Sequence, residues 1–295
     1  MNYYNEIKTE LINNEIYKKV KDYSKNRSDL NTYYNVGKLL NDAGKHYGEG
    51  IIKQYSIKLC IDLKNNFDVS SLNKMRKFYM LIEKMATVSP KLSYSHYVEL
   101  LPYKDIQKIK YYIKITEEQN LSVRELRNRI KNKEYERLDN KTKELLIENK
   151  ENNTIESFIK EPIIIKNNLD TNEISEKVLK QLILEDLDNF LKELGEGFCY
   201  LENEYKIKLG DRYNYIDILL FNIKFNCYVV VELKVVELSK EHIGQVQMYM
   251  NYIDKNLKTV TQSDTVGIII CKKNNQYVIE YCSNTNIFST TYILN

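Results

Sequence analysis

The sequence predicts an α+β protein in which an all-helical domain is followed by a domain with a mixed β-sheet. Three observations lead to this prediction. Apolar residues recur every three or four positions up to residue 138, a polar stretch rich in asparagine follows, and the apolar period later changes to two. The chain has 295 residues, of which 43% are apolar and 29% are charged. This composition allows a core in each of two domains and is too apolar for a disordered chain.

Residues 1–138 are predicted to form the helical domain. Helical spacing of apolar residues appears in NTYYNVGKLLNDAG, IIKQYSIKLCIDL, LNKMRKFYMLIEKM and IQKIKYYIKI, and Gly, Asn, Asp and Pro residues separate these segments. Ser122, with Glu125 three residues later, has the pattern of a capping box that opens a last helix, SVRELRNRIKNKEYERL.

The rest of the chain is predicted to be a linker, 139–173, and a second domain, 174–295. The linker is polar, rich in asparagine and contains Pro162. The second domain opens with a helix, ISEKVLKQLILEDLDNFLKELG, that Gly195 closes. We expect strands at CYLENEYKIKL, YNYIDILLFN and CYVVVELKVV, a helix at SKEHIGQVQMYMNYID, and strands at TVGIIIC and YVIEYC. A strand, a crossover helix and another apolar strand imply a parallel pair within a mixed sheet.

Charge is divided unevenly between the two parts of the chain. Residues 1–138 carry 26 Lys and Arg against 17 Asp and Glu, a net charge of +9, whereas residues 139–295 carry 18 against 24, a net charge of −6. A basic half suits a polyanion such as DNA, and an acidic half suits divalent cations. A chance imbalance on solvated helices is the alternative reading.

We expect a cytoplasmic protein with no membrane segment. The chain contains no run of 18 apolar residues, and its N-terminus, MNYYNEIKTE, lacks the pattern of a signal peptide. The five cysteines are scattered and form no CxxC pair, which indicates reduced thiols. Three histidines in the whole chain argue against a His-rich zinc site.

Three ionisable residues interrupt the apolar strands of the second domain. Glu232 and Lys234 are two positions apart, so their side chains share one face of a strand, and Asp217 lies on the preceding strand. If the two strands are antiparallel neighbours, Asp217 comes near Glu232. Two close carboxylates can bind Mg²⁺ or Mn²⁺, with the backbone carbonyl of Leu233 as a further ligand. Lys234 can then orient a water molecule toward a phosphorus atom. A salt bridge of Lys234 with either carboxylate, without catalysis, is the alternative.

The following helix carries Gln245 and Tyr249, which are four residues apart and therefore on one face. A Gln amide can hydrogen-bond a metal-bound water or the lysine, and a Tyr hydroxyl can contact a phosphate. A solvated Gln and a core Tyr are the structural alternative.

The basic half contains a predicted helix-turn-helix, IIKQYSIKLCIDLKNNF followed by SSLNKMRKFYMLIEKM. The early residues of the second helix suit contacts with DNA bases or phosphates. A second basic cluster lies on the last helix of this domain. The candidate nucleic-acid-binding residues are Asn73, Lys74, Arg76, Lys77, Arg124 and Arg127. An ordinary amphipathic helix is the alternative.

The pattern of Asp217, the Glu232-Leu-Lys234 triplet and Gln245-x-x-x-Tyr249 resembles the PD-(D/E)xK nuclease superfamily, and the chain is most similar to its YhcG-like bacterial members. The similar segments of the second domain are FLKELGEGFCYLENEYKIKLGDRYNYIDILLFN, CYVVVELK and GQVQMYMNYID. Those of the first domain are YYNVGKLL, YGEGIIKQYSIKL, FDVSSLNKMRKFY, LSYSHYVELL and LSVRELRNRIKNKEYERL. Tyr34 and Tyr94 stand where such proteins often have Trp, and Ile216 stands in place of Pro.

The resemblance implies a restriction-endonuclease-like αβββαβ core and metal-dependent hydrolysis of phosphodiester bonds in DNA, in defence, mobile elements or repair. It assigns the catalytic positions to Asp217, Glu232 and Lys234, with Gln245 in support. Some relatives add a carboxylate from the helix before the strands, for which Glu185 is our candidate and Glu193 the alternative. The rival hypotheses are a DNA-binding or assembly module that no longer cuts, and a solute-binding or structural protein. RNA as the substrate, and a partner protein or second copy bound by the helical domain, stay open.

Overall fold

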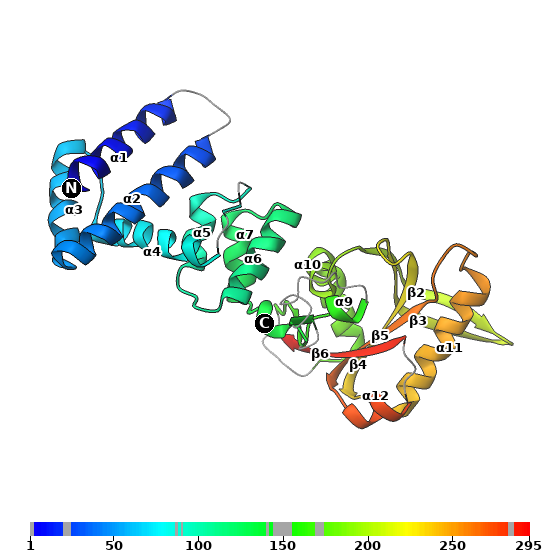
Figure 1. Ribbon diagram of the computed structural model, residues 1–295. Helices are drawn as coiled ribbons and strands as arrows, with labels where there is room; N and C mark the ends of the chain where they lie inside the picture. The colour runs from blue at the N-terminus through cyan, green and yellow to red at the C-terminus, as the bar shows by residue number, and fades with distance from the viewer. Residues whose placement is uncertain are drawn as a thin grey trace. The chain divides into compact units, whose positions relative to one another are not determined.

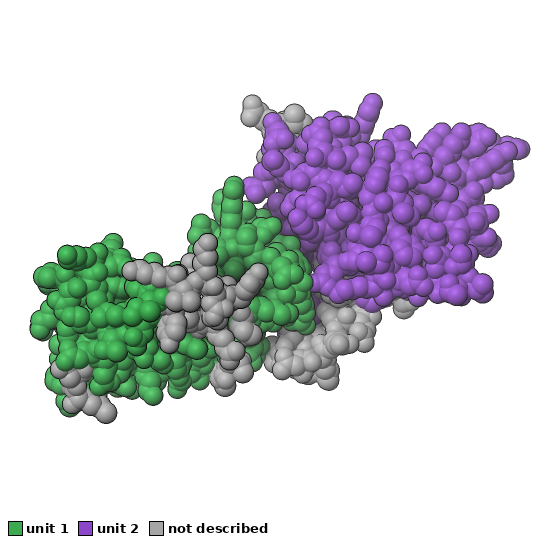
Figure 2. All heavy atoms as spheres, turned by 90° about the horizontal axis from the view of Figure 1, so that it is seen from above, with its two compact units in different colours: residues 1–135 green, residues 136–295 purple. Residues whose placement is uncertain are grey.

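A computed structural model describes residues 3–19, 25–85, 88–89, 91–139, 142–143, 155–168, 174–282 and 286–295. The chain divides into two compact units, residues 1–135 and residues 136–295, which Figure 2 colours separately. None of the helices in the described ranges combines the length and the apolar character that crossing a bilayer requires.

All of the regular secondary structure described in the first unit is helical. Its helices are α1 (Tyr3–Lys19), α2 (Lys25–Tyr47), α3 (Gly50–Leu63), α4 (Val69–Met85), α5 (Tyr94–Leu100), α6 (Ile106–Gln119) and α7 (Val123–Lys131). The apolar faces of α1 to α4 share a core in which Leu40, Leu59 and Leu72 are fully buried. The predicted capping box is present, because the Glu125 N–H donates to Ser122 Oγ and the Ser122 N–H donates to Glu125 Oε2 at 2.8 Å.

The second unit is built on a six-stranded mixed sheet. Two 3₁₀ turns come first: η1 (Tyr135–Arg137), which begins in the first unit, and η2 (Ile155–Phe158). The helices and strands that follow are β1 (Ile163–Ile165), α9 (Glu176–Glu185), α10 (Leu187–Leu194), β2 (Phe198–Leu209), β3 (Arg212–Asn222), β4 (Cys227–Glu237), α11 (Lys240–Asn256), β5 (Val266–Lys273), α12 (Gln276–Cys282) and β6 (Ile287–Leu294). The strand order is β1-β6-β5-β4-β3-β2. Strands β2, β3 and β4 pair antiparallel, and β4, β5, β6 and β1 pair parallel. The αβββαβ order and the parallel pair around the crossover helix α11 are therefore confirmed.

Helices cover both faces of this sheet (Figure 1). Helices α9 and α10 pack on one face with Val229, Val231 and Leu233, while α11 and α12 pack on the other face with Val230 and Ile269. The alternation along β4 follows from the period of two in a strand. The near-continuous apolar sequence of β4 reflects its burial on both sides.

A glycine on β5 lets α11 approach the sheet closely. A Cβ atom at Gly267 would lie 2.4 Å from Val246 Cγ1 and 2.8 Å from Met250 Sδ, both on α11. We expect Gly267→Ala to lower the free energy of unfolding by about 1–3 kcal/mol, because the added methyl group overpacks this contact. Chemical denaturation followed by circular dichroism measures the change. Gly244→Ala is the control, since its added methyl group would meet no atom within 4 Å apart from its chain neighbours and the backbone of its own helix. An equal loss in both variants would contradict the packing argument.

Two predicted elements of the second unit differ in the structure. The helix expected before the strands is two helices, interrupted at Asp186, whose φ of −128° and ψ of 51° are not helical. The segment YVIEYC is helix α12 and not a strand, and the last strand is β6. Tyr277 and Tyr281, four residues apart, are each 75% exposed, whereas Val278 and Ile279 pack on the α11 core. This spacing fits one side of a helix better than alternation does.

Part of the predicted linker belongs to the sheet. Within 139–173, the segment β1 pairs in parallel with β6, with Ile163 opposite Tyr292. Its three isoleucines are buried in the core beneath α9 and α10 or at its margin. A continuous run of three buried β-branched residues explains why this segment is a strand, although the polar residues around it indicate a linker.

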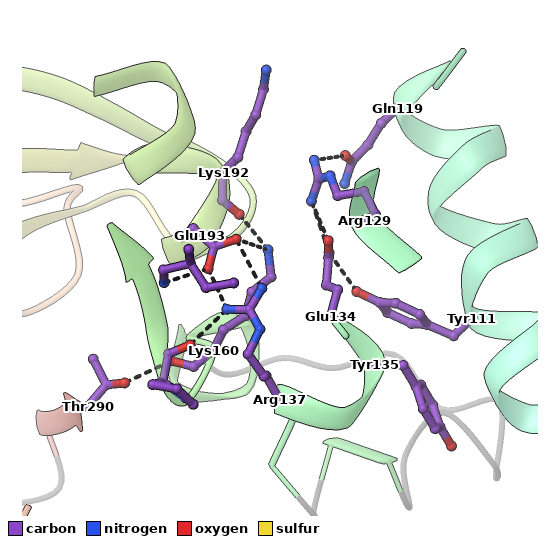
Figure 3. Close-up of polar contacts among 12 residues, drawn as sticks. Tyr111, Gln119, Arg129, Glu134, Tyr135, Arg137, Lys160, Lys192, Glu193 and Thr290 are labelled. Atoms are coloured by element: carbon purple, nitrogen blue, oxygen red, sulfur yellow. Dashed lines mark hydrogen bonds and ion pairs between the residues drawn. The ribbon is translucent and has the colours of Figure 1, made fainter. Parts of the chain in front are cut away.

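A buried ionic cluster holds β1 in place (Figure 3). Arg137 donates through both terminal nitrogens to the carboxylate of Glu193 and also to the carbonyl of Pro162 at 2.7 Å. Glu193 Oε2 accepts the backbone N–H of Ile164 at 3.0 Å, and Lys160 Nζ lies 3.8 Å from Glu193 Oε1. Glu193 therefore stabilises the fold and lies outside the set of catalytic candidates in which the sequence had placed it.

Candidate active site

The expected meeting of Asp217 and Glu232 occurs where the ladder between β3 and β4 ends. The last paired residues are Ile218 and Val231, and Asp217 and Glu232 are the next residue along each strand. Beyond that point β4 is bonded to a side chain of β3, because Asp217 Oδ2 accepts the backbone N–H of Leu233 at 3.0 Å. The antiparallel pairing predicted from the sequence is thus the arrangement that brings Asp217 to the backbone beside Glu232.

Glu232 and Lys234 form a buried ion pair on the same face of β4. Lys234 Nζ donates to Glu232 Oε1 at 2.9 Å, and the side chains of Lys234 and Glu232 are 11% and 3% exposed. The second carboxylate oxygen, Glu232 Oε2, is buried and has no hydrogen-bond partner among the described residues. A buried acceptor without a partner costs free energy, so this oxygen is available to a ligand that supplies positive charge or a proton.

Helix α9 adds two charged residues that the sequence analysis did not single out. Glu176 Oε2 lies 3.6 Å from Lys234 Nζ, and Lys180 Nζ donates to Asp217 Oδ1 at 3.1 Å and to Glu204 Oε1 at 2.9 Å. Glu176 and Lys180 are one turn apart and therefore share a side of α9. That spacing in SEKVLKQL is the signal that could have identified them.

The carboxylate that the helix brings to the site is Glu176, in place of either expected glutamate. Glu185 lies at the other end of α9 and accepts a hydrogen bond from Gln181 Nε2 at 3.2 Å. Glu193 is held in the cluster around Arg137. Sequence reasoning favoured the glutamates nearer to the strands, whereas the first turn of α9 is the part that reaches Lys234.

Gln245 and Tyr249 face each other on α11, as their spacing predicts. Gln245 Nε2 donates to the Tyr249 hydroxyl at 2.9 Å. Burial raises the pKa of Tyr249, and the charges of Glu232 and Asp217 raise it further against the effect of Gln245. The phenol is therefore a neutral donor. Because its oxygen accepts from Gln245, its own hydrogen is left to donate toward the carboxylates or a bound phosphate.

Burial and neighbouring charge change the acidity of the central residues. Burial raises the pKa of Glu232 from 4.5 to about 7, the charge of Asp217 adds to this, and Lys234 opposes it. Burial also disfavours the charge of Lys234, yet its hydrogen bond to Glu232 and the surrounding carboxylates raise the pKa of Lys234 above its ordinary value. Lys234 is thus an ammonium group, and Glu232 is a carboxylate that gains from a nearby cation.

We expect the raised pKa of Glu232 to make stability depend on pH. Below pH 4.5 Glu232 is protonated in both the folded and the unfolded chain; between pH 4.5 and about 7 only the unfolded chain loses this proton. The free energy of unfolding should therefore fall across this window as pH rises, by about 3 kcal/mol from this one group. Denaturation in EDTA of wild type and Glu232→Gln, at pH 4.5 to 8, measures it: the difference between them should grow with pH. Parallel curves would contradict the assignment.

The donor set at this site fits a hard divalent cation. It consists of the unpartnered Glu232 oxygen, Asp217, and the backbone of Leu233 beside them. Burial, and after it the charge of Asp217, raise the pKa of Glu232, and a cation beside the two carboxylates would offset both effects. In the described ranges no group of three or more His, Cys, Asp and Glu side chains forms a metal cage. Mg²⁺ retains several waters and binds through one or two carboxylates, so two suffice.

The candidate nucleic-acid-binding residues of the first unit differ in their surroundings. Lys74, Lys77 and Arg124 are exposed, and Asn73 is half-buried. Arg76, by contrast, donates to both carboxylate oxygens of Glu49, which raises the pKa of Arg76. Arg127 likewise pairs with Glu99, at 2.7 Å and 3.0 Å. The charges of both arginines are compensated within the unit.

Two family models match the chain, one for each part. Residues 9–137 match the DUF1016 N-terminal domain, and residues 156–295 match the YhcG PDDEXK nuclease domain. A curated protein of Escherichia coli (strain K12), named "Putative nuclease YhcG", is 25% identical over 283 residues, which covers 81% of this chain and 76% of that protein.

Two solved structures match part of the chain at low similarity. One is described as a crystal structure of a repair endonuclease from Pyrococcus abyssi, with 20% identity and a TM-score of 0.29; the other is described as the structure of an EndoMS–dsDNA2 complex, with 17% identity and a TM-score of 0.30. Each match covers 42% of this chain, and the chain spans less than half of those proteins, 49% and 48%. The family models, one for each part of the chain, carry the assignment: the chain consists of a DUF1016 N-terminal domain followed by a YhcG PDDEXK nuclease domain.

Proposed function

We propose that this protein is a metal-dependent nuclease that hydrolyses phosphodiester bonds in DNA. One observation carries the proposal: a buried carboxylate, Glu232, keeps an unpartnered oxygen beside an ammonium group and a second carboxylate. Such a group is too costly for a structural role alone, and its cost is offset when a cation binds. The family of the second unit, a nuclease domain, supports the same reaction.

Asp217 and Glu232 would hold Mg²⁺ or Mn²⁺, with the carbonyl of Leu233 as a further ligand. The bound cation supplies stabilisation of the negative charge that develops on the phosphate oxygens. Lys234, kept protonated, orients the attacking water by donating a hydrogen bond and does not accept its proton. The water oxygen bonds to phosphorus and releases one proton to the surrounding solvent, the bond from phosphorus to the leaving oxygen breaks, and that oxygen takes up one proton from solvent, so that one water molecule is consumed for each bond cut.

The remaining residues position these groups. Tyr249, held by Gln245, donates its hydroxyl hydrogen toward the carboxylates or the phosphate. Lys180 holds Asp217, and Glu176 holds Lys234 from the side of α9. In this proposal the charged residues of α9 fix the carboxylate of Asp217 and the ammonium of Lys234 before the substrate arrives.

Incubation of plasmid DNA with the protein in Mg²⁺, Mn²⁺ or EDTA tests the proposal. Nicking or linearisation with a metal and none in EDTA supports the nuclease. Intact plasmid under every condition, together with a retained gel shift, supports the alternative of a DNA-binding module that no longer cuts.

The first unit is proposed to bind DNA through exposed basic residues. Lys74 and Lys77 lie in the early turns of α4, and Arg124 lies at the start of α7. Asn73 can add a contact to a base edge or a phosphate. Arg76 and Arg127 are paired with Glu49 and Glu99. A phosphate in contact with either arginine would therefore share that arginine's positive charge with the glutamate.

We expect Lys74→Ala/Lys77→Ala to weaken binding of duplex DNA and to reduce its salt dependence. Each lost phosphate contact lowers the slope of log affinity against log salt by roughly 0.9, so the pair should lower it by up to roughly 1.8. Fluorescence anisotropy in EDTA between low and moderate salt measures the slope. Lys110→Ala/Lys114→Ala, a second exposed pair in the same unit, is the control. Equal slopes in wild type and the α4 variant would remove α4 from the interface.

A further inference from the structure

The hairpin of β2 and β3 continues beyond Asp217 and has two different faces. Ile207 and Ile216 are buried against the core of α11, whereas the residues between and around them on the opposite face are exposed. In Figure 1 the turn end of this hairpin extends away from α9 and α10, which cover the same side of the sheet elsewhere. The exposed residues of this face between Glu204 and the turn, which we call the hairpin face, are Lys206, Lys208, Tyr213 and Tyr215.

Lysines and tyrosines are paired across the hairpin face. The register places Lys208 opposite Tyr213 and Lys206 opposite Tyr215. Lys206 Nζ lies 3.9 Å from the centroid of the Tyr213 ring, and Lys208 Nζ lies 5.9 Å from it. Both rings remain largely in solvent, with Tyr213 54% and Tyr215 52% exposed. Large aromatic side chains at this exposure are available to a ligand with planar rings, and the ammonium groups beside them suit an anion.

The hairpin face leads directly to the candidate active site. Tyr213, Tyr215 and Asp217 alternate along β3, so they project from the same side of the strand. At about 3.3 Å per residue, Tyr215 lies about 7 Å and Tyr213 about 13 Å from Asp217 along β3. On β2, Lys208 and Lys206 are followed at the same spacing by Glu204. Lys180 Nζ donates hydrogen bonds to both Glu204 and Asp217. The face is thus continuous with the carboxylate that would hold the metal.

Aromatic rings alternating with cations match the chemistry of an unpaired nucleic-acid strand. Its bases expose planar faces that stack on Tyr, and its phosphates attract Lys, whereas a duplex hides its base faces within the helix. We propose that the hairpin face binds single-stranded DNA next to the phosphate that is cut, with bases stacked on Tyr213 and Tyr215 and phosphates bound by Lys206 and Lys208. This inference rests on the proposed nuclease function and adds that the substrate is unpaired beside the cleavage site.

The test measures binding of fluorescein-labelled oligothymidine (20 nucleotides) to the full chain by anisotropy, in EDTA so that no cleavage occurs. We expect Tyr213→Ala/Tyr215→Ala to weaken binding by roughly tenfold for each ring that stacks. Tyr213→Phe/Tyr215→Phe keeps the rings and should bind within about twofold of wild type. Lys206→Ala/Lys208→Ala should lower the salt slope by roughly 1.4, since each phosphate contact on a single strand contributes roughly 0.7.

A matched control is available on the same unit. Tyr277 and Tyr281 of α12 are each 75% exposed and lie outside the hairpin face. Tyr277→Ala/Tyr281→Ala should therefore bind oligothymidine as wild type does. Hydrogen exchange provides a second measurement, because bound oligothymidine should slow exchange of peptides that cover residues 203–215. Circular dichroism spectra and melting curves confirm that each variant is folded.

The outcomes separate this inference from the proposed nuclease function. If wild type cuts plasmid with a metal but the Ala variant binds oligothymidine as tightly as wild type, the inference fails and the function stands. If the Ala variant loses binding and wild type cuts nothing with any metal, the function fails and the strand-binding face stands. Equal losses in the Phe and Ala variants, an equal loss of duplex binding in the Ala variant, or no binding by wild type overturns the inference.

Discussion

Asp217→Asn should reduce metal-dependent cleavage of plasmid DNA by roughly a thousandfold or more, because it removes a charged metal ligand and leaves the shape of the side chain. The amide oxygen can still accept the N–H of Leu233, which Asp217 Oδ2 accepts at 3.0 Å, so the junction of β3 and β4 should persist. The readout is the initial rate of nicking with Mg²⁺ and with Mn²⁺. We expect Glu232→Gln and Lys234→Met to lower the rate comparably, since the three groups act together.

The control for this prediction is a carboxylate in the same unit that lies away from the site. Asp188 is 82% exposed and pairs with Lys192 on the surface of α10. Asp188→Asn should retain the wild-type rate. Isothermal titration with Mn²⁺ adds a readout that is independent of cleavage, because Asp217→Asn should weaken binding and Asp188→Asn should not. Cleavage by Asp217→Asn near the wild-type rate would contradict the assignment of Asp217 as a metal ligand.

Glu193→Ala should produce the largest loss of stability among the single substitutions considered. It leaves Arg137 and Lys160, whose side chains are 8% and 4% exposed, without their buried carboxylate. Breaking a buried ion pair from one side costs about 3–5 kcal/mol, since a buried charge loses its opposite charge. The N–H of Ile164 also loses its acceptor. We therefore expect β1 to detach from β6 before the rest of the sheet unfolds.

Hydrogen exchange measured by mass spectrometry locates this effect. Peptides that cover β1 and β6 should exchange much faster in Glu193→Ala than in wild type, while peptides from α2 and α4 in the first unit should be unchanged. Asp188→Ala removes an exposed ion pair on the same helix and should leave exchange as it is. A melting temperature and exchange pattern equal to wild type in Glu193→Ala would contradict the structural role of the cluster.

Local pattern predicted most of the elements that carry the site. The apolar period of two in β3 and β4, the period of 3.6 in α11 and the capping box at Ser122 all depend on residues close in sequence. For the same reason the shared face of Glu232 and Lys234, and that of Gln245 and Tyr249, follow from sequence spacing alone. The prediction of a strand at YVIEYC is wrong because six residues of mixed character fit both periods, and packing against α11 selects the helix.

Such local patterns do not predict contacts between residues that are distant in sequence. Glu176 meets Lys234 across 58 positions of sequence and Glu193 meets Arg137 across 56, so no local spacing distinguishes the glutamate at the site from the one in the cluster. The strand β1 joins β6 for a similar reason, since parallel pairing is made by the remote partner and not by the turn residues nearby. Local periodicity thus specified the elements and the charged faces of this chain through steric and hydrophobic preferences of neighbouring residues. Long-range packing determined which charged side chains pair, which are buried, and which carboxylate keeps an oxygen without a hydrogen-bond partner. Burial and pairing depend on residues that are close in space and distant in sequence.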